Sequence, residues 1–369
     1  MIEILEGLLA SMERGSPIAI ASIVAGHGSL PMSRRAKMLV HSDGSQRGTV
    51  GGGCIEAEVH ALATEAMRQD RVFLRSYTLT ETQAGAEGLN CGGTVEILVE
   101  PFLPDGTASQ ARAILMQALD ALRRRELMVL ATLVGGTESE PAVVGRGLIG
   151  SEGLAAGVGL LAQPGVDAAL RGAVERESLA IMGQDRAAWI QLPETDGPRR
   201  ALLETLSAPP VLFLFGGGHV SLAVAGVARL AGFNVVVVDD RPAFSNPERF
   251  PDADRTLVLP MASAFQHLDV DEGSYIVAVT RGHQHDEPVI EQALRTRAAY
   301  IGMLGSRRKV AIMWQRLRER GVSEEDLARV HAPIGLPIGA DTPAEIAVSI
   351  VAQLIEARRA SGRRKPDGA

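Results

Sequence analysis

Short apolar runs alternate with longer amphipathic stretches throughout the second half of the chain. Apolar residues at spacings of three and four indicate helices, and compact β-branched runs indicate strands. The pattern predicts strands at 211–215, 234–238, 256–259, 275–280 and 299–303 and helices at 219–230, 287–297 and 307–320. Such alternation is typical of a parallel sheet with helices on both faces. We therefore expect a Rossmann-like, doubly wound C-terminal domain.

The first half shows no such regular rhythm. Its pattern predicts strands at 17–24, 37–41, 46–50, 94–99, 127–134, 143–149 and 157–162 and helices at 1–12, 55–68 and 108–125. Strands and helices that do not alternate indicate a mixed α/β domain. No internal repeat stands out in the sequence.

Residues 193–210 combine prolines, charges and a helix-like stretch at 199–206, which together mark a domain boundary. A chain of 369 residues also exceeds what a single core usually supports. We therefore predict an N-terminal domain at 1–208, a C-terminal domain at 209–360 and a frayed basic tail at 361–369. A last helix is predicted at 343–358, because Thr342 and Glu345 form a capping pattern around Pro343.

Charge and hydropathy exclude several classes of protein. The formal net charge of −7 and the pI near 5.7 argue against a protein that coats nucleic acid or an anionic membrane. The N-terminal segment carries Glu3 and Glu6 and lacks the basic region of a signal peptide. The apolar runs fall far below the ~18 residues that a membrane span needs. We expect a cytoplasmic protein that binds neither nucleic acid nor membranes.

A glycine turn, Gly216-Gly217-Gly218, lies between the first predicted strand of the C-terminal domain and a helix that opens at His219. In this context backbone N–H groups and the helix dipole bind a phosphate. Ser221 occupies the position of the third glycine in the usual motif. The turn favours a nucleotide-like ligand, with a Rossmann scaffold that binds nothing as the alternative.

Two acids end the next predicted strand. A ribose-binding carboxylate is expected ~20 residues after the glycines, and Asp239 and Asp240 lie close to that spacing. An acid there suits a free ribose hydroxyl, although the adjacent Arg241 leaves a 2′-phosphate open.

Two further loops follow predicted strands, where ligands of open parallel sheets collect. One loop holds His283, His285 and Asp286, which are either metal ligands or hydrogen-bonding groups. The other holds Ser306 and Arg307, followed by Arg308 and Lys309, a basic helix start suited to an anion. We expect both loops and the glycine turn to converge on one crevice.

Only two cysteines occur, Cys54 and Cys91, which excludes a disulfide framework and a four-cysteine zinc site. Cys54 follows three glycines and precedes a predicted helix, so the helix dipole favours its thiolate. Cys91 lies beside two glycines that leave its sulfur open to approach. Both thiols are candidates for a functional role, and packing in the interior is the alternative.

Motifs across nearly the whole chain resemble the XdhC/CoxI family, the accessory proteins of xanthine dehydrogenase and related molybdenum hydroxylases. In the N-terminal domain they are Gly28-Ser29 with Pro31, Lys37 to Val40, Asp43-Gly44 and Gly51 to Glu56. In the C-terminal domain they are Phe215 to His219, Asp239 to Arg241, His283 to Asp286, Tyr300 to Lys309, Pro333 to Leu336 and Gly339 to Ser349. The middle of the chain, about 101–209, carries little of the resemblance.

This resemblance implies a chaperone that binds the molybdenum cofactor, assists its sulfuration and inserts it into an apo molybdenum hydroxylase. The cofactor would be molybdopterin or its cytosine dinucleotide form, and a cysteine desulfurase would be a further partner. The crevice would hold the phosphate end, and Cys54, with Cys91, would contact the soft molybdenum centre. The resemblance also implies a homodimer.

Two other classes of function stay open at this point. A nicotinamide-dependent oxidoreductase, using NAD(P), would explain the glycine turn and Asp239, but no hydride-transfer constellation is evident and both cysteines would be idle. A purely structural assembly partner of the hydroxylase is the third class. We therefore expect a maturation factor rather than a turnover enzyme, with no catalytic residue assigned.

Overall fold

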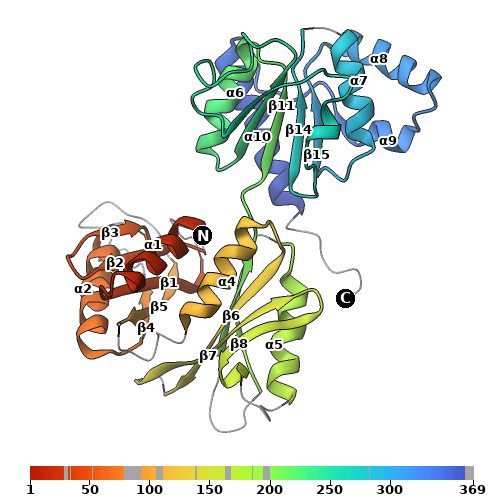
Figure 1. Ribbon diagram of the computed structural model, residues 1–369. Helices are drawn as coiled ribbons and strands as arrows, with labels where there is room; N and C mark the ends of the chain where they lie inside the picture. The colour runs from red at the N-terminus through yellow and green to blue at the C-terminus, as the bar shows by residue number, and fades with distance from the viewer. Residues whose placement is uncertain are drawn as a thin grey trace. The chain divides into compact units, whose positions relative to one another are not determined.

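Figure 1 shows the computed structural model of the chain, which divides into two compact units, Met1–Ala208 and Pro209–Ala369. The structure describes residues 1–28, 32–33, 35–51, 53–78, 93–104, 111–137, 139–162, 168–184, 186–193, 200–281 and 283–361, without the side chains of Cys54, His283, Gln284 and Ser361. Cys91 and residues 362–369 of the tail predicted at 361–369 lie outside these residues. Across the described ranges, no helix has both the length and the hydropathy to cross a bilayer.

The C-terminal unit is built on a six-stranded sheet in which every strand pair is parallel. Its strands, in spatial order, are β13 (Arg255–Val258), β12 (Asn234–Asp239), β11 (Val211–Phe215), β14 (Ser274–Ala278), β15 (Tyr300–Met303) and β16 (Val330–His331). The main helices are α6 (His219–Leu230), α7 (His283–Leu294), α8 (Arg307–Glu319) and α10 (Pro343–Ser361), with shorter turns η3 (Ala264–His267) and α9 (Glu324–Ala328).

Helices cover both faces of this sheet (Figure 1), which confirms the predicted doubly wound fold. Val235 and Val237 of β12 pack with α6 and α10, whereas Val236 and Val238 pack with α7 and α8. Successive side chains of a strand point to opposite faces. A strand that is buried on both faces therefore reads as a continuous apolar run, as Val235 to Val238 of β12 do.

The order of the strands reverses between β11 and β14, because the chain first builds β11, β12 and β13 outward and then returns to the other side. Ligands of open parallel sheets bind at such a point, outside the carboxyl ends of the strands. The glycine turn after β11 and the loops after β12 and β14 all lie at this edge.

The predicted capping pattern of the last helix is confirmed. The Thr342 side chain accepts a hydrogen bond from the Glu345 N–H at 3.3 Å, and the Glu345 carboxylate accepts one from the Thr342 N–H at 3.0 Å. This reciprocal pair satisfies backbone donors that the first turn of a helix otherwise leaves without partners.

The N-terminal unit contains two five-stranded sheets. The first has the order β3-β2-β1-β5-β4, from β1 (Ile18–His27), β2 (Lys37–His41), β3 (Gln46–Gly48), β4 (Phe73–Thr78) and β5 (Thr94–Phe102), with helices α1 (Ile2–Glu13) and α2 (Gly53–Gln69). The second has the order β8-β7-β6-β10-β9, from β6 (Met128–Gly136), β7 (Pro141–Gly150), β8 (Gly153–Gly159), β9 (Ala187–Gln191) and β10 (Arg200–Leu206), with α4 (Arg112–Arg123), η2 (Leu160–Ala162) and α5 (Ala168–Ile181).

The helix-like stretch predicted at 199–206 is wrong. Residues 200–206 form β10, an inner strand between β6 and β9. Ala201 and Leu203 pack towards one apolar cluster and Leu202 towards another, so burial on both faces removed the alternation that marks a strand. The second sheet repeats the strand order of the first, a similarity that does not stand out in the sequence.

Buried ion pairs join the two sheets of the N-terminal unit. Lys37 on β2 lies 2.7 Å from Glu204 on β10, and Arg146 on β7 pairs with Glu100 on β5. All four side chains are less than a tenth exposed. A buried charge is tolerated only when its partner and hydrogen bonds replace water, and Lys37 also donates to Ser22 at 2.8 Å.

Replacing Lys37 by Met should destabilise the N-terminal unit by roughly 3–5 kcal/mol, because it leaves Glu204 charged and buried without its cation. The double variant Lys37→Met/Glu204→Leu should recover most of that loss. Urea unfolding in a Trp314→Phe background, in which Trp189 reports on this unit, measures both values.

The exposed pair of Arg47 and Glu3 provides the control, because its side chains are more than half exposed. Arg47→Met should cost less than about 1 kcal/mol. Equal losses for Arg47→Met and Lys37→Met would contradict the structural role given to the buried pair.

Candidate functional site

The glycine turn after β11 brings the backbone closer to its neighbours than a side chain would allow. Gly216 has φ +106°, and a Cβ atom on it would lie 2.5 Å from the Val279 carbonyl oxygen. A Cβ atom on Gly217 would lie 1.8 Å from the carbonyl oxygen of Phe244. Both positions therefore require glycine for the fold itself.

Gly218 differs from these two glycines. It is the N-cap of α6 with φ −73°, a value open to any residue, and a Cβ atom on it would meet nothing within 4 Å. No side chain caps the helix there, and His219 at its first position is exposed. The start of α6 thus offers backbone N–H groups beside open space, which is the arrangement that binds anions.

Asp239 holds the glycine turn in place. Its carboxylate accepts hydrogen bonds from the Gly217 N–H at 2.7 Å, from the Arg241 N–H at 3.0 Å and from two nitrogens of the Arg241 guanidinium at 2.8 and 3.0 Å. Burial alone would raise the pKa of Asp239, but the hydrogen bonds from Arg241 and Gly217 lower it to about 2. Four donors occupy the lone pairs of this carboxylate, so it has no acceptor left for a ribose hydroxyl.

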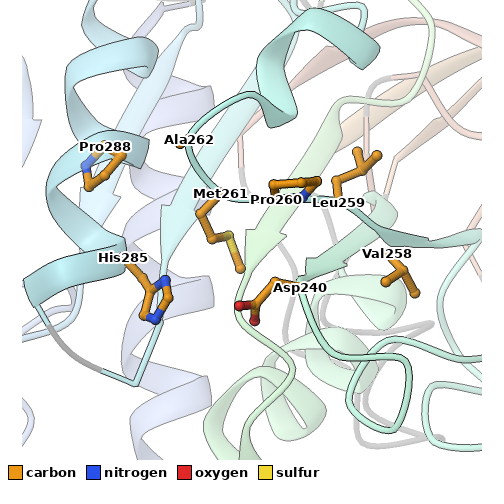
Figure 2. A pocket seen from close by; sticks show the side chains of 8 residues that line it. All are labelled: Asp240, Val258, Leu259, Pro260, Met261, Ala262, His285 and Pro288. Atoms are coloured by element: carbon orange, nitrogen blue, oxygen red, sulfur yellow. The ribbon is translucent and has the colours of Figure 1, made fainter.

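Asp240 is the acid at this position that faces open space. Together with His285 it lines a pocket of about 420 Å³, whose other walls are Val258, Leu259, Pro260, Met261, Ala262 and Pro288. Figure 2 shows the Asp240 carboxylate, the Met261 side chain and the His285 ring facing this pocket. A mostly apolar pocket with a carboxylate and an imidazole suits a flat, polar-edged group such as a base with its ribose.

An exposed ion pair spans the crevice. The Arg281 guanidinium, which follows β14, lies 3.1 Å from each oxygen of Asp240, which follows β12. Arg281 is about half exposed, so the pair can open at little cost. An anion in the crevice would compete with Asp240 for this arginine.

The loop after β15 has fewer unpaired positive charges than its sequence indicates, because Lys309 forms an ion pair. Lys309 lies 2.5 Å from the fully buried Asp286, which also accepts from the Thr280 hydroxyl at 2.6 Å. Asp286 thus acts as a hydrogen-bonding group that ties α7 to α8. Ser306 caps α8 by accepting from the Lys309 N–H, whereas Arg307 and Arg308 are exposed and have no ion-pair partner among the described residues.

No group of three or more metal-liganding side chains lies together among the described residues. The backbone of His283 begins α7, but its side chain lies outside the described part of the chain, so the predicted pair with His285 is not tested. Cys91 lies outside the described residues altogether.

In the N-terminal unit, Cys54 occupies the second position of α2. The Glu56 carboxylate in the same turn accepts from the Val50 N–H at 3.3 Å and from the Thr49 hydroxyl. Thr49 and Gly51 also line a pocket of about 560 Å³ together with Ser33, Ala36 and Lys37. The predicted helix start at Cys54 therefore lies next to a cavity, although the thiol itself is not among the described side chains.

Sequence analysis missed two residues of the crevice, Arg249 and Phe244. Arg249 donates from Nε to the Gly217 carbonyl oxygen at 2.9 Å, and its guanidinium lies 5.1 Å from the Phe244 ring. Arg241 stacks on the same ring at 3.5 Å. No motif marks these contacts, because they depend on how the 241–250 segment folds back on the glycine turn.

Two family models and a solved structure match the chain. The family model of the XdhC Rossmann domain matches residues 212–354, and that of the XdhC and CoxI family matches residues 11–78. A solved structure from Bacillus halodurans, named a xanthine dehydrogenase, shares 26% identity with a TM-score of 0.76 and covers 100% of this chain and 97% of its own.

Three curated relatives differ in name and length. The uncharacterized protein YqeB of Escherichia coli is 26% identical over 94% of this chain and 44% of its own. A probable xanthine dehydrogenase component of Bacillus subtilis is 33% identical over 48% of this chain and 51% of its own. The molybdenum cofactor insertion chaperone PaoD of E. coli is 22% identical over 96% of this chain and 88% of its own. The chain thus spans about half the length of the first two relatives.

Replacing Asp239 by Asn should destabilise the C-terminal unit by about 2 kcal/mol at pH 7, because an amide cannot accept all four hydrogen bonds and carries no charge for Arg241. Since the folded-state pKa is depressed, this stabilisation is complete above the unfolded pKa of 3.8 and is lost as the pH falls through about 2. Urea unfolding in a Trp189→Phe background, followed by Trp314 fluorescence, measures the difference.

The difference between wild type and Asp239→Asn should therefore shrink between pH 4 and pH 2. Glu272→Gln, in an exposed pair with Arg297, is the matched control and should change stability by less than about 1 kcal/mol. A wild type and an Asp239→Asn variant of equal stability at pH 7 would refute the anchoring role.

Proposed function

Because the chain belongs to the XdhC/CoxI family, we propose that it is an accessory protein that binds the molybdenum cofactor and delivers it to an apo molybdenum hydroxylase of the xanthine dehydrogenase type. The observation that carries this proposal is the similarity to a molybdenum cofactor insertion chaperone over 96% of this chain and 88% of that relative. An alignment of this extent includes both units, so it supports a shared task and not only a shared Rossmann domain.

The crevice of the C-terminal unit suits the phosphate end of the cofactor. The uncapped start of α6 and the open space at Gly218 provide backbone donors, and Arg281, Arg307 and Arg308 provide exposed cations at the same edge of the sheet. If the cofactor carries a cytosine nucleotide, the pocket beside Asp240 and His285 would accept the base and ribose.

The N-terminal unit suits the molybdenum end. A thiolate is a soft ligand, and a cysteine in the first turn of a helix is more easily deprotonated than one in a strand. Cys54 has this position at the start of α2. We propose it as the principal contact to molybdenum, with Cys91 as a second ligand or an acceptor of transferred sulfur.

Three finer points complete the proposal. The protein assists sulfuration of the cofactor before insertion, with a cysteine desulfurase as the source of sulfur. It acts in the cytoplasm, as a homodimer, and as a maturation factor rather than a turnover enzyme. A nicotinamide-dependent oxidoreductase is the competing function, and the four donors to Asp239 weaken it because they leave only Asp240 for a ribose.

Deleting the gene should leave the partner hydroxylase folded and assembled but inactive, for lack of a competent cofactor. The measurement compares molybdenum, cyanide-releasable sulfur and activity of the hydroxylase purified from deletion and parent strains. Normal values of all three in the deletion strain would refute the proposal.

Gly218→Val should weaken binding of the cofactor at least tenfold, because its side chain would enter open space at the start of α6. Its cost in stability should stay at about 1 kcal/mol, the usual cost of a poor N-cap residue. Calorimetric titrations with the cofactor, cytidine nucleotides and nicotinamide nucleotides would identify the ligand. Gly172→Val, at another unhindered helical glycine, is the matched control. Binding of NAD(P) alone would favour the oxidoreductase, and equal affinity in wild type and Gly218→Val would exclude the crevice.

Cys54→Ser should lose most of the molybdenum and pterin that co-purify with the protein, while Cys91→Ser should lose less. Both variants should melt within a few degrees of the wild type, since one oxygen replaces one sulfur. Full cofactor retention by a folded Cys54→Ser variant would remove this residue from the site, and equal loss in both variants would indicate a shared two-sulfur site.

A further inference from the structure

The two halves of the N-terminal unit repeat one another in the order of their strands and α-helices. Each half runs helix, three strands, helix, two strands: α1, β1 to β3, α2, β4 and β5 in the first, and α4, β6 to β8, α5, β9 and β10 in the second. We propose that this unit is an internal duplication in which only the first half keeps a ligand site, the 560 Å³ pocket beside the start of α2.

The strand registers of the two halves correspond residue by residue. The cross-strand neighbours are Ser22 with Lys37 and Leu98 in the first half, and Thr132 with Arg146 and Leu202 in the second. In both halves the inner strand has the same two partners, and all the pairings are antiparallel. The register of each strand depends on which of its faces is buried, so two unrelated sheets are not expected to share the same cross-strand pairs.

The contacts between the halves are reciprocal. Lys37 of the first half pairs with Glu204 of the second, and Arg146 of the second pairs with Glu100 of the first. Lys37 corresponds to Arg146, and Glu100 corresponds to Glu204. An exchange of this kind is what a two-fold axis produces in a symmetric dimer.

The ends of the first helices also agree. After α1 the chain turns at Gly15 with φ +63°, and after α4 it turns at Arg125 with φ +60°. The hydrogen bonds match as well, from the Gly15 N–H to Met12 at 3.2 Å and from the Arg125 N–H to Leu122 at 3.2 Å. A non-glycine residue in this conformation is uncommon, so the second half has kept the turn although it lost the glycine.

The halves differ where the first one has its pocket. In the first half Thr49 and Gly51 lie between β3 and α2, and both residues line the cavity with Ala36 and Gly48. The pairing of β7 with β8 identifies the counterparts of Ala36, Gly48 and Thr49 as Gly145, Gly157 and Val158.

In the second half an additional turn, η2, fills the corresponding space. A Cβ atom on Gly145 would lie 3.0 Å from the Leu160 nitrogen, and one on Gly157 would lie 3.0 Å from the Leu161 carbonyl oxygen. The Leu161 side chain is 1% exposed within the core of this half. Packed residues thus occupy in the second half the space that remains a cavity in the first half, near the start of α2 at Cys54.

The pocket has the chemistry of a site for a small polar heterocycle. Met32 and Ala36 give it apolar walls, and Ser33 and Thr49 give it hydroxyl groups. The ammonium group of Lys37, which also lines the pocket, is already bound to Glu204 and Ser22. Its volume lies within the range of small-molecule sites. Resting on the proposed function, we assign it to the pterin end of the molybdenum cofactor, next to the cysteine that would contact the metal.

The test compares equivalent changes in the two halves of the full-length protein. Ala36→Leu fills the pocket, and Val158→Leu enlarges a residue at the filled counterpart. Each variant is first checked by thermal melt, and its affinity for free pterin is then measured by calorimetry. Ala36→Leu should bind pterin at least tenfold more weakly, while Val158→Leu should match the wild type. Thr49→Val, which removes a polar group with little change in volume, replaces Ala36→Leu if that variant does not fold.

Unchanged pterin affinity in the first-half variant, equal losses in both halves, or a wild type that binds no pterin would overturn the assignment. Molybdenum content of the protein purified from a cofactor-producing host is measured in parallel. A wild type that binds pterin but carries no molybdenum would refute the proposed function and leave this pocket standing as a pterin site.

Discussion

The C-terminal crevice depends on one buried carboxylate, that of Asp239. A buried charge is costly unless donors replace its lost water, and four donors from Gly217 and Arg241 do so here. Arg241 stacks on Phe244, whose carbonyl oxygen leaves no room for a side chain on Gly217, and Arg249 donates to the Gly217 carbonyl oxygen. The end of β11, the end of β12 and the 241–250 segment are therefore fixed before any ligand arrives. Such preorganisation reduces the ordering cost that binding would otherwise incur.

The parallel sheet was predictable because β11, β14 and β15 are apolar runs that are each followed by a helix. The capping residues of the last helix were predictable because their contacts are local. Strand β10 was not, because burial on both faces gives Leu202 and Leu203 the same apolar character. The sequence also could not separate Asp239 from Asp240. Both acids end the same strand, and only the fold decides that one faces the glycine turn and the other a pocket. The sequence predicts where a polar residue lies along a strand or loop. The group with which it forms hydrogen bonds depends on the tertiary structure.

The same limit explains why the duplication in the N-terminal unit is invisible in the sequence. Where the two halves differ in residue, they still agree in burial and charge sign: a lysine in one corresponds to an arginine in the other, and a serine to a threonine. Buried ion pairs add little net stability, because desolvation offsets most of the attraction, but they penalise any arrangement that leaves one charge unpaired. Two reciprocal pairs between the sheets therefore specify how the halves dock. Apolar contacts such as Leu98 and Leu202 supply the stability that the charges do not.

A protein that receives a cofactor and passes it on must bind it well enough to protect it and weakly enough to release it. Each 1.4 kcal/mol of binding free energy changes a dissociation constant about tenfold. A difference of a few kcal/mol between donor and acceptor is therefore enough to drive the transfer. The crevice has the features of a moderate binder. Its cations are exposed, one of them already pairs with Asp240, and the helix start contributes only about 0.3–1 kcal/mol at an exposed terminus. An apo-hydroxylase that buries the same phosphate and nucleotide more completely would then take the cofactor by mass action, without any step that consumes energy.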